Sequence, residues 1–202
     1  KYAFEVNGLY WHGEVSGKKN RNYHLNKTKM CACYGINLVH IFESELRDKF
    51  PIVRSVIQNL LNIPTGVDRI YARKCEIRTV EIKEKNNFLL NNHLQGEDRS
   101  TIKYGLYYNG SLVSLMTFRR TSRFDKNVEW ELSRFCNKIN TNIVGGASKL
   151  FKHFLKQHSP RDIVSYCDRR FFGGEIYKIL GFNFVDHTQP GYYYIVNIYK
   201  DL

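Results

Sequence analysis

The chain has 202 residues, of which 43% are hydrophobic and 14% aromatic, enough for two modest domains or one larger one with a real core. No apolar run approaches the roughly 18 residues that span a bilayer, which excludes a membrane-spanning helix and argues against a membrane partner. The formal net charge of +12 is spread over both halves and favours a polyanionic partner, above all nucleic acid.

The first elements predict a strand, a helix and a second strand. Residues 2–7 alternate in the period-two pattern of a strand with two distinct faces. After a polar loop over 13–22, residues 23–31 have helical spacing, and Gly35 is placed to end that helix. Residues 36–43 are strongly apolar and predict a short strand. This order predicts a crossover that brings both strands into one sheet.

Ionisable residues cluster around the first of these strands. Glu5, Asn7 and His12 offer a carboxylate, an amide and an imidazole beside Trp11, a set that can hold a metal ion and move a proton. The alternative is an edge strand with a half-exposed histidine and a core tryptophan. Five cysteines (31, 33, 75, 136 and 167) have no regular spacing, which predicts free thiols in a reducing intracellular compartment and no zinc site at Cys31-Ala-Cys33.

Three motifs in this region carry a resemblance. E-x-N-G-x-x-W-H at 5–12, Y-H-L-x-K-T at 23–28 and G-I-x-L-x-x-I-F-E at 35–43 resemble the very-short-patch-repair-like endonucleases, and more closely the phage homing endonucleases grouped with them. The resemblance covers about residues 1–63 and implies a variant of the PD-(D/E)xK nuclease fold. It also implies a DNA partner and, for a phage-encoded protein, the host cytoplasm.

The resemblance also implies roles for single residues. Glu5 takes the acidic, metal-binding position of the second core strand, with Asn7 where many nucleases place Lys. His12 takes the position of the general acid/base, and His24 falls near a helical catalytic position. The family's first metal-binding Asp lies on the strand before Glu5, and the sequence begins too late to contain it. Without that Asp, an Mg²⁺ or other divalent ion loses a ligand, and the fragment is expected to be weakened or inactive as a nuclease.

Residues 43–63 predict a connecting helix with Pro51 in its first turn, and a linker follows at 64–72. From there the chain predicts strands at 75–80, 103–108, 112–119, 127–137, 162–167, 182–185 and 192–198, and helices at 83–94, 144–155 and 174–180. Asn109-Gly110 is a strong hairpin signal. The glycine-rich turn at 144–148 exposes backbone N–H groups at a helix N-terminus, where an anion such as phosphate can bind, although tight turns also use glycine for steric reasons alone.

Residues 73–202 resemble the GNAT acetyltransferase superfamily. The resemblance rests on the element order, on Val144-Gly145-Gly146-Ala147 and on the run Tyr177–Phe182. It implies that Gly145, Gly146 and Ala147 hold the pyrophosphate of acetyl-CoA and that Tyr177 is the general acid. Asn142 stands where the family usually has Gln or Arg, and no clear base is present beyond the candidates Glu129 and Glu131.

Basic and aromatic residues supply candidate DNA contacts. The arginines around position 120 are expected in a loop that straddles phosphates, and Phe171, Phe172 and Tyr192–Tyr194 are candidates for base stacking. The alternatives are solvated surface for the arginines and core or edge packing for the tyrosines. The candidate DNA-binding residues are Lys18, Lys19, Arg21, Lys27, Arg119, Arg120, Arg123, Arg169 and Arg170.

The sequence therefore predicts an α/β (α+β) chain: a truncated nuclease core over 1–63, a linker over 64–72 and a GNAT-like mixed-sheet domain over 73–202. The leading hypothesis is a metal-dependent homing or repair-like DNA endonuclease whose GNAT-like domain extends the DNA contact. The alternative is an acetyl-CoA-dependent N-acetyltransferase. A third hypothesis is a non-catalytic DNA-binding or virion-associated phage protein.

Overall fold

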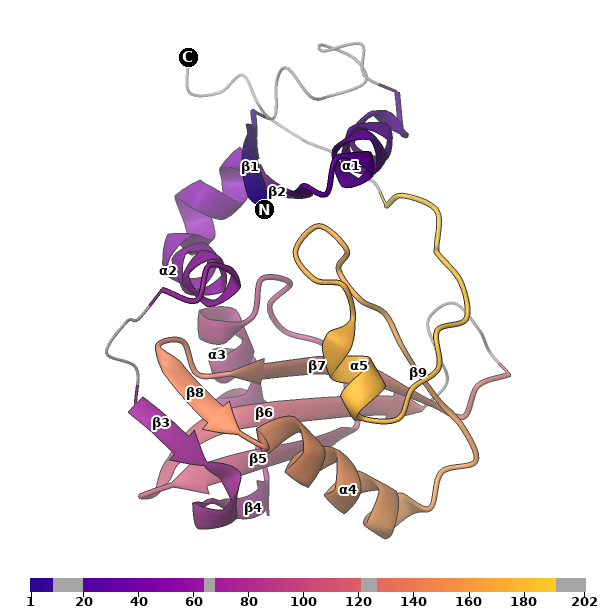
Figure 1. Cartoon of the computed structure of the whole chain (residues 1–202). Helices are drawn as coiled ribbons and strands as arrows, with labels where there is room; N and C mark the ends of the chain where they lie inside the picture. Colours follow the sequence, from indigo (N-terminus) through magenta and orange to yellow (C-terminus); the bar gives the residue numbers. More distant parts are fainter. Residues whose placement is uncertain (9–19, 64–67, 121–126, 192–202) are drawn as a thin grey trace, which may run out of the picture. The chain divides into compact units, whose positions relative to one another are not determined.

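A computed structural model describes residues 1–8, 20–63, 68–120 and 127–191 (Figure 1). The chain divides into two compact units. The first takes in Lys1–Phe50, Asp168–Gly173 and the described residues from Phe184 onward; the second takes in Pro51–Cys167 and Gly174–Asn183. No helix within the described ranges is both long enough and apolar enough to cross a bilayer.

The first unit is built on a parallel pair of strands joined by a helix. Strand β1 (Tyr2–Asn7) leads through residues 8–22 to helix α1 (Tyr23–Cys33), and β2 (Asn37–Phe42) then pairs with β1 in parallel. Gly35, at φ +67°, follows the helix end and lets the chain reverse into β2. The predicted crossover is therefore confirmed.

Strand β1 has its apolar residues on the outer face. Tyr2, Phe4 and Val6 are 42%, 38% and 57% exposed, whereas Asn7 is fully buried and Glu5 is largely buried. Because side chains alternate along a strand, Glu5 and Asn7 share the inner face of β1, and Leu38, Val39, His40 and Ile41 of the neighbouring strand β2 are buried.

Helix α2 (Glu43–Leu60) is two helical segments joined at a kink. Lys49 has non-helical angles (φ −136°, ψ 27°), and Pro51 follows two residues later. Proline lacks a backbone N–H, so Pro51 cannot donate the hydrogen bond that would continue the first helical segment across the kink. The helix as a whole begins at Glu43, and its second segment begins after the kink at Lys49. Pro51 therefore lies in the first turn of the second segment. The predicted linker boundary stays a prediction, because residues 64–67 lie outside the described ranges.

The second unit contains a five-stranded mixed sheet. Its order is β4 (Glu76–Thr79), β5 (Ile102–Tyr108), β6 (Ser111–Arg120), β7 (Trp130–Asn137) and β9 (Ile163–Ser165). Neighbours are antiparallel except β7 and β9, which are parallel. The hairpin between β5 and β6 turns at Asn109 and Gly110, both with positive φ, as the Asn-Gly signal predicts.

Helices cover both faces of this sheet (Figure 1). Helix α4 (Gly146–His158) buries Leu150, Phe151 and Phe154 against Met116 and Phe118 of β6. Helix α3 (Ile82–Asn92) buries Phe88 and Leu89 on the other side, with Leu112 and Leu115. Helix α5 (Glu175–Ile179) is short, and its Ile176 packs at the edge of the α4 cluster.

Two short strands were not predicted. Strand β3 (Asp68–Tyr71), in the expected linker, pairs in parallel with β8 (Thr141–Val144), and a 3-10 turn, η1 (Ala72–Lys74), follows β3. The strand predicted at 182–185 was wrong, since those residues form no strand in the structure. The one predicted at 192–198 lies outside the described residues.

Candidate functional site

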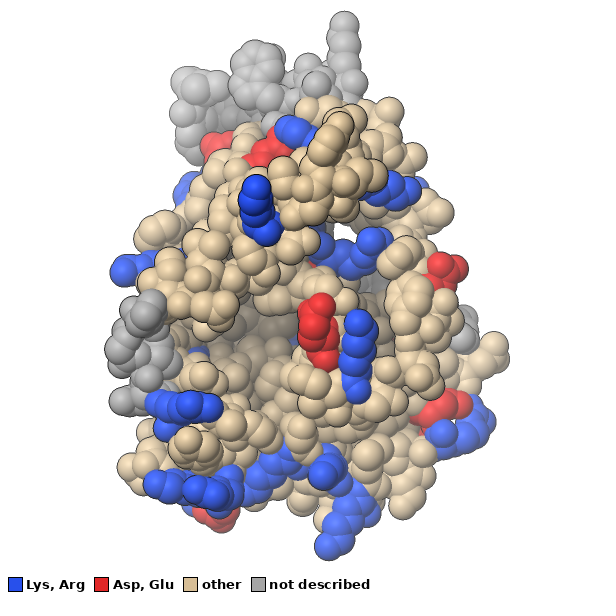
Figure 2. Space-filling view, in the orientation of Figure 1, with Lys and Arg blue, Asp and Glu red and all other residues tan. Residues whose placement is uncertain are grey.

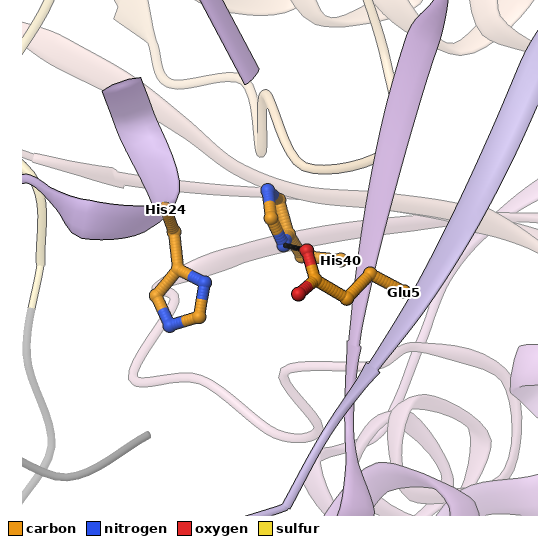
Figure 3. A group of neighbouring side chains, drawn as sticks. All are labelled: Glu5, His24 and His40. Atoms are coloured by element: carbon orange, nitrogen blue, oxygen red, sulfur yellow. Dashed lines mark ion pairs between the residues drawn. The ribbon is translucent and has the colours of Figure 1, made fainter. Parts of the chain in front are cut away.

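Three ionisable side chains converge in the first unit. Glu5 comes from β1, His40 from β2 and His24 from the first turn of α1 (Figure 3). One ligand atom of each lies within 4.8 Å of the other two, and His40 Nδ1 is 3.4 Å from Glu5 Oε2. The strand register creates the pair, because Glu5 stands directly opposite His40.

A hydrogen-bond chain orients His40. Its Nε2 lies 2.9 Å from Thr28 Oγ1, and that hydroxyl donates to the backbone oxygen of His24 at 2.9 Å. Since the Thr28 hydrogen is used in this way, the network assigns the ring proton to Nε2 of His40. His40 Nδ1 then accepts from Asn7 Nδ2 at 3.3 Å, and Glu5 Oε2 lies 3.4 Å from the same nitrogen.

Lys27 and Glu5 form an ion pair of opposite charges beside His40. Lys27 Nζ donates to Glu5 Oε1 at 2.6 Å, and this hydrogen bond raises the pKa of Lys27. Burial lowers the pKa of His40 below its usual range, and the Glu5 carboxylate opposes that effect only in part. A neutral imidazole is thus favoured at His40 near neutral pH. Lys27, a predicted phosphate contact, is held in an ion pair with Glu5.

The other predicted residues of this unit have varied outcomes. His12, Lys18 and Lys19 lie outside the described residues, so their roles stay predictions. Arg21 Nε donates to the backbone oxygen of Pro190 at 2.8 Å. Sequence reasoning missed His40, although a signal existed: it is an ionisable residue inside the buried apolar run Leu38–Ile41, where a polar group needs partners.

In the second unit, the sheet opens between two parallel strands. Strand β7 pairs with β9 from Trp130 to Leu132, and Leu132 opposite Ser165 is the last pair. The pairing of β7 with β6 shifts register at the same point and leaves Ser133 as an extra residue. Such a bulge bends and twists a strand. Among the described residues, no strand covers the free edge of β7 beyond Leu132.

The glycine-rich turn begins α4. Gly145 has φ +75° and precedes the helix, a conformation that favours glycine. A Cβ on Gly146 would lie 2.9 Å from Ile143 Cγ2, so close packing alone explains that glycine. The first helical hydrogen bond runs from Lys149 N to Gly145 O, which leaves the N–H groups of Gly146 and Ala147 in the unpaired first turn.

Tyr177 lies where β9 ends. Its hydroxyl donates to the backbone oxygen of Tyr166 at 3.3 Å, one residue past the last residue of β9. Burial raises the pKa of Tyr177 above its usual range, so the phenol stays protonated at neutral pH. The hydroxyl thus keeps its proton, which it donates to the Tyr166 oxygen in this structure.

The two predicted base candidates are both engaged by arginines. Glu131 Oε2 accepts from Arg119 Nη2 at 2.6 Å, and Glu129 lies 3.5 Å from Arg120 Nη1 and accepts from the backbone N–H of Arg161. The loop predicted for the arginines was wrong for Arg119 and Arg120, which end strand β6, and Arg123 lies outside the described residues.

The predicted pair Arg169 and Arg170 splits into two environments. Arg169 is exposed. Arg170 is about one-quarter exposed, bonds Asp168 at 2.7 Å and Glu45 at 2.9 Å, and lies over the Phe42 ring. Arg170 therefore holds the first unit together, which leaves Arg169 as the better candidate for contact with phosphate.

Comparisons with known proteins give a limited result. No family model matches the chain, and no curated protein does. A crystal structure of a ribosomal-protein-alanine N-acetyltransferase from Brucella melitensis biovar Abortus 2308 is similar at 12% identity, over 60% of this chain and 97% of that one, with a TM-score of 0.39. The chain is mixed α/β with a five-stranded mixed sheet, as predicted, whereas the GNAT likeness stays a prediction and no comparison supports an endonuclease domain.

Proposed function

We propose that the second unit binds an acyl-coenzyme A and transfers its acyl group to an amine. The observation that carries this proposal is the opening of the sheet beyond Leu132, at the Ser133 bulge. A strand edge that no other strand covers can pair with an extended ligand that carries amides, as the pantetheine arm of coenzyme A does.

The region around the turn into α4 has features that suit the binding of the phosphate groups of such a ligand. Backbone N–H groups at a helix N-terminus attract anions. Lys and Arg side chains gather over the part of the surface that carries β3, β4 and α4 (Figure 2). Arg69 stands opposite Asn142 in the β3–β8 pair, and Arg73 lies in η1. These arginines supply positive charge near the position where Asn142 replaces the cation or amide of the resembling family.

The reaction follows ordinary acyl-transfer chemistry. The amine nitrogen attacks the thioester carbonyl, a C–N bond forms, the C–S bond breaks, and the proton that the nitrogen loses passes to solvent, from which Tyr177 is protonated again. Tyr177, kept protonated by burial, donates its proton to the departing thiolate. Replacing Tyr177 by Phe is expected to lower kcat about 100-fold while KM changes little, because the hydroxyl acts on the leaving group and not on ligand binding.

A matched pair of glycine variants tests the binding. Asn tolerates positive φ, so Gly145→Asn adds a side chain at the proposed phosphate site with little backbone strain. Gly110, at φ +76° in the hairpin turn, has the same backbone requirement, and Gly110→Asn is the control. Calorimetry with acetyl-CoA should show binding by the wild type and by Gly110→Asn, and weakened binding by Gly145→Asn. Absence of heat with the wild type at millimolar acetyl-CoA contradicts the proposal.

A second candidate function, metal-assisted hydrolysis of a DNA phosphodiester, is favoured by the Glu5–Lys27 pair on the β1–α1–β2 unit. A carboxylate next to a lysine can hold a divalent ion and a phosphate together. Supercoiled plasmid incubated with Mg²⁺ or Mn²⁺ tests it. Cleavage that Glu5→Gln abolishes supports hydrolysis, whereas DNA binding without cleavage by the wild type favours the non-catalytic hypothesis.

A further inference from the structure

We propose that Glu5, His24 and His40 form a binding site for one Zn²⁺-like transition-metal ion (Figure 3). The three side chains come from three separate elements, β1, α1 and β2, and their ligand atoms approach one point. Sequence resemblance places a metal at Glu5 alone; the two imidazole ligands follow from the folded arrangement.

The spacing suits an ion with short bonds. Tetrahedral Zn²⁺ with bonds of about 2.0–2.1 Å needs ligand atoms about 3.3 Å apart. His40 Nδ1 and Glu5 Oε2 are already 3.4 Å apart, and all three ligand atoms lie within 4.8 Å of one another. A shift of at most roughly 1.5 Å at the His24 ring would bring the three ligand atoms to that spacing.

The surroundings orient the ligands. Lys27 holds Oε1 of Glu5, which directs Oε2 toward His40. Thr28 holds Nε2 of His40, which directs Nδ1 toward the same point. Metal-binding histidines commonly use their second nitrogen in this way, because the bond fixes the tautomer and the orientation of the ring.

Asn7 is a second, independent observation. It is fully buried, its Nδ2 lies 3.3 Å from His40 Nδ1, and its Oδ1 has no hydrogen-bond partner in the described part of the chain. A buried amide oxygen without a partner is costly. With the amide turned over, which exchanges Nδ2 and Oδ1, an ion at the three ligands or a water bound to that ion would be the partner that this oxygen lacks.

The donor set selects the class of ion. Two imidazoles and one carboxylate suit Zn²⁺ and neighbouring first-row ions, whereas Mg²⁺ prefers oxygen ligands in octahedral geometry. Three protein ligands leave a fourth position for water or substrate, as in catalytic zinc sites. The proposal extends the second candidate function by naming the ion and its ligands. Metal binding is measured without DNA cleavage. A chain that binds the ion but does not cleave DNA therefore contradicts the second candidate function and leaves the metal site in place.

The test is calorimetric titration of the whole chain, freed of metal, with Zn²⁺ and separately with Mg²⁺. We expect one Zn²⁺ per chain and an affinity at least 100-fold above that for Mg²⁺. His24→Ala and Glu5→Gln should each weaken Zn²⁺ binding at least 10-fold. His40 is 3% exposed, so its replacement risks misfolding, and His24 and Glu5 therefore carry the test, with circular dichroism to confirm folding.

Two control variants separate this site from other donors. His187→Gln removes an exposed histidine outside the cluster, and Cys31→Ser/Cys33→Ser removes the thiols of α1. Both should bind one Zn²⁺ as the wild type does. Unchanged Zn²⁺ affinity in folded His24→Ala, loss of binding in the cysteine variant, or equal affinity for Mg²⁺ would each overturn the proposal.

Discussion

Lys85 and Asp98 form an ion pair in the interior of the second unit, with Nζ and Oδ1 3.0 Å apart and side chains that are 3% and 7% exposed. The Asp98 carboxylate also accepts from Thr117 Oγ1 at 2.7 Å and from Ser100 Oγ at 2.9 Å. The pair thus ties α3 to strand β6 and to the segment before β5. Both charged groups have hydrogen-bond partners, and removal of one charge leaves the other buried without a counter-charge.

Replacing Asp98 by Ala should lower the free energy of unfolding by about 3 to 5 kcal/mol, because the Lys85 ammonium stays buried without its counter-charge. Urea unfolding measures the loss. The double variant Lys85→Met/Asp98→Leu removes both charges and should recover most of it. A single variant that unfolds at the same urea concentration as the wild type contradicts this account.

The same pair predicts a pH dependence. Burial tends to raise the pKa of Asp98, but hydrogen bonds from Thr117, Lys85 and Ser100 outweigh it and hold the pKa below 3.8. A carboxyl with a depressed folded pKa stabilises the fold above its unfolded pKa, and that stabilisation is lost as the pH falls through the folded value. The stability difference between wild type and Asp98→Asn should therefore be constant above pH of about 5 and shrink below about 4. A difference that does not change over this range would rule out the charged pair.

The cysteines should differ in reactivity. All five are free thiols; Cys33 is exposed, whereas Cys75 is buried and burial raises its pKa. Because the thiolate is the reactive form, an alkylating reagent at neutral pH should modify Cys33 first and Cys75 only on unfolding. Peptide mass mapping over time follows the order of modification. Equal rates at the two positions in native protein would mean that Cys75 is accessible.

Arg169 and Arg170 give a prediction with a built-in control. Arg170→Ala should lower the free energy of unfolding by about 2 kcal/mol, since Glu45 and Asp168 lose a shared, partly buried partner. Arg169→Ala should leave stability nearly unchanged and, if DNA binds, reduce the salt dependence of binding by about one phosphate contact. The opposite pattern would exchange the two roles.

Elements with strong local signals were predictable from the sequence. The Asn109-Gly110 hairpin, the helix that ends before Gly35 and the turn into α4 each depend on a residue whose backbone preference is unusual. The short strands β3 and β8 were missed because each has four residues and gains its hydrogen bonds from a partner about 70 positions away. No local pattern encodes such a pair.

The site in the first unit was predictable only in part. Glu5 and His24 follow from motif resemblance, whereas His40 depends on the register that places it opposite Glu5. In the second unit, the sequence suggests the Gly145 turn and Tyr177, but the opening between β7 and β9 depends on the Ser133 bulge. A bulge is a property of two paired strands, and one strand's sequence does not show it.

The outward apolar face of β1 has a consequence for the folding landscape. A slip of one residue against β2 would turn Phe4 and Val6 inward and Glu5 and Asn7 outward, and hydrophobic burial by itself would favour that arrangement. The observed register is therefore locally frustrated, and the Glu5–Lys27 pair and the Asn7–His40 contact stabilise it against the slipped one. An ion bound by Glu5 and His40 would add to that preference, so that metal binding and strand alignment become one coupled equilibrium.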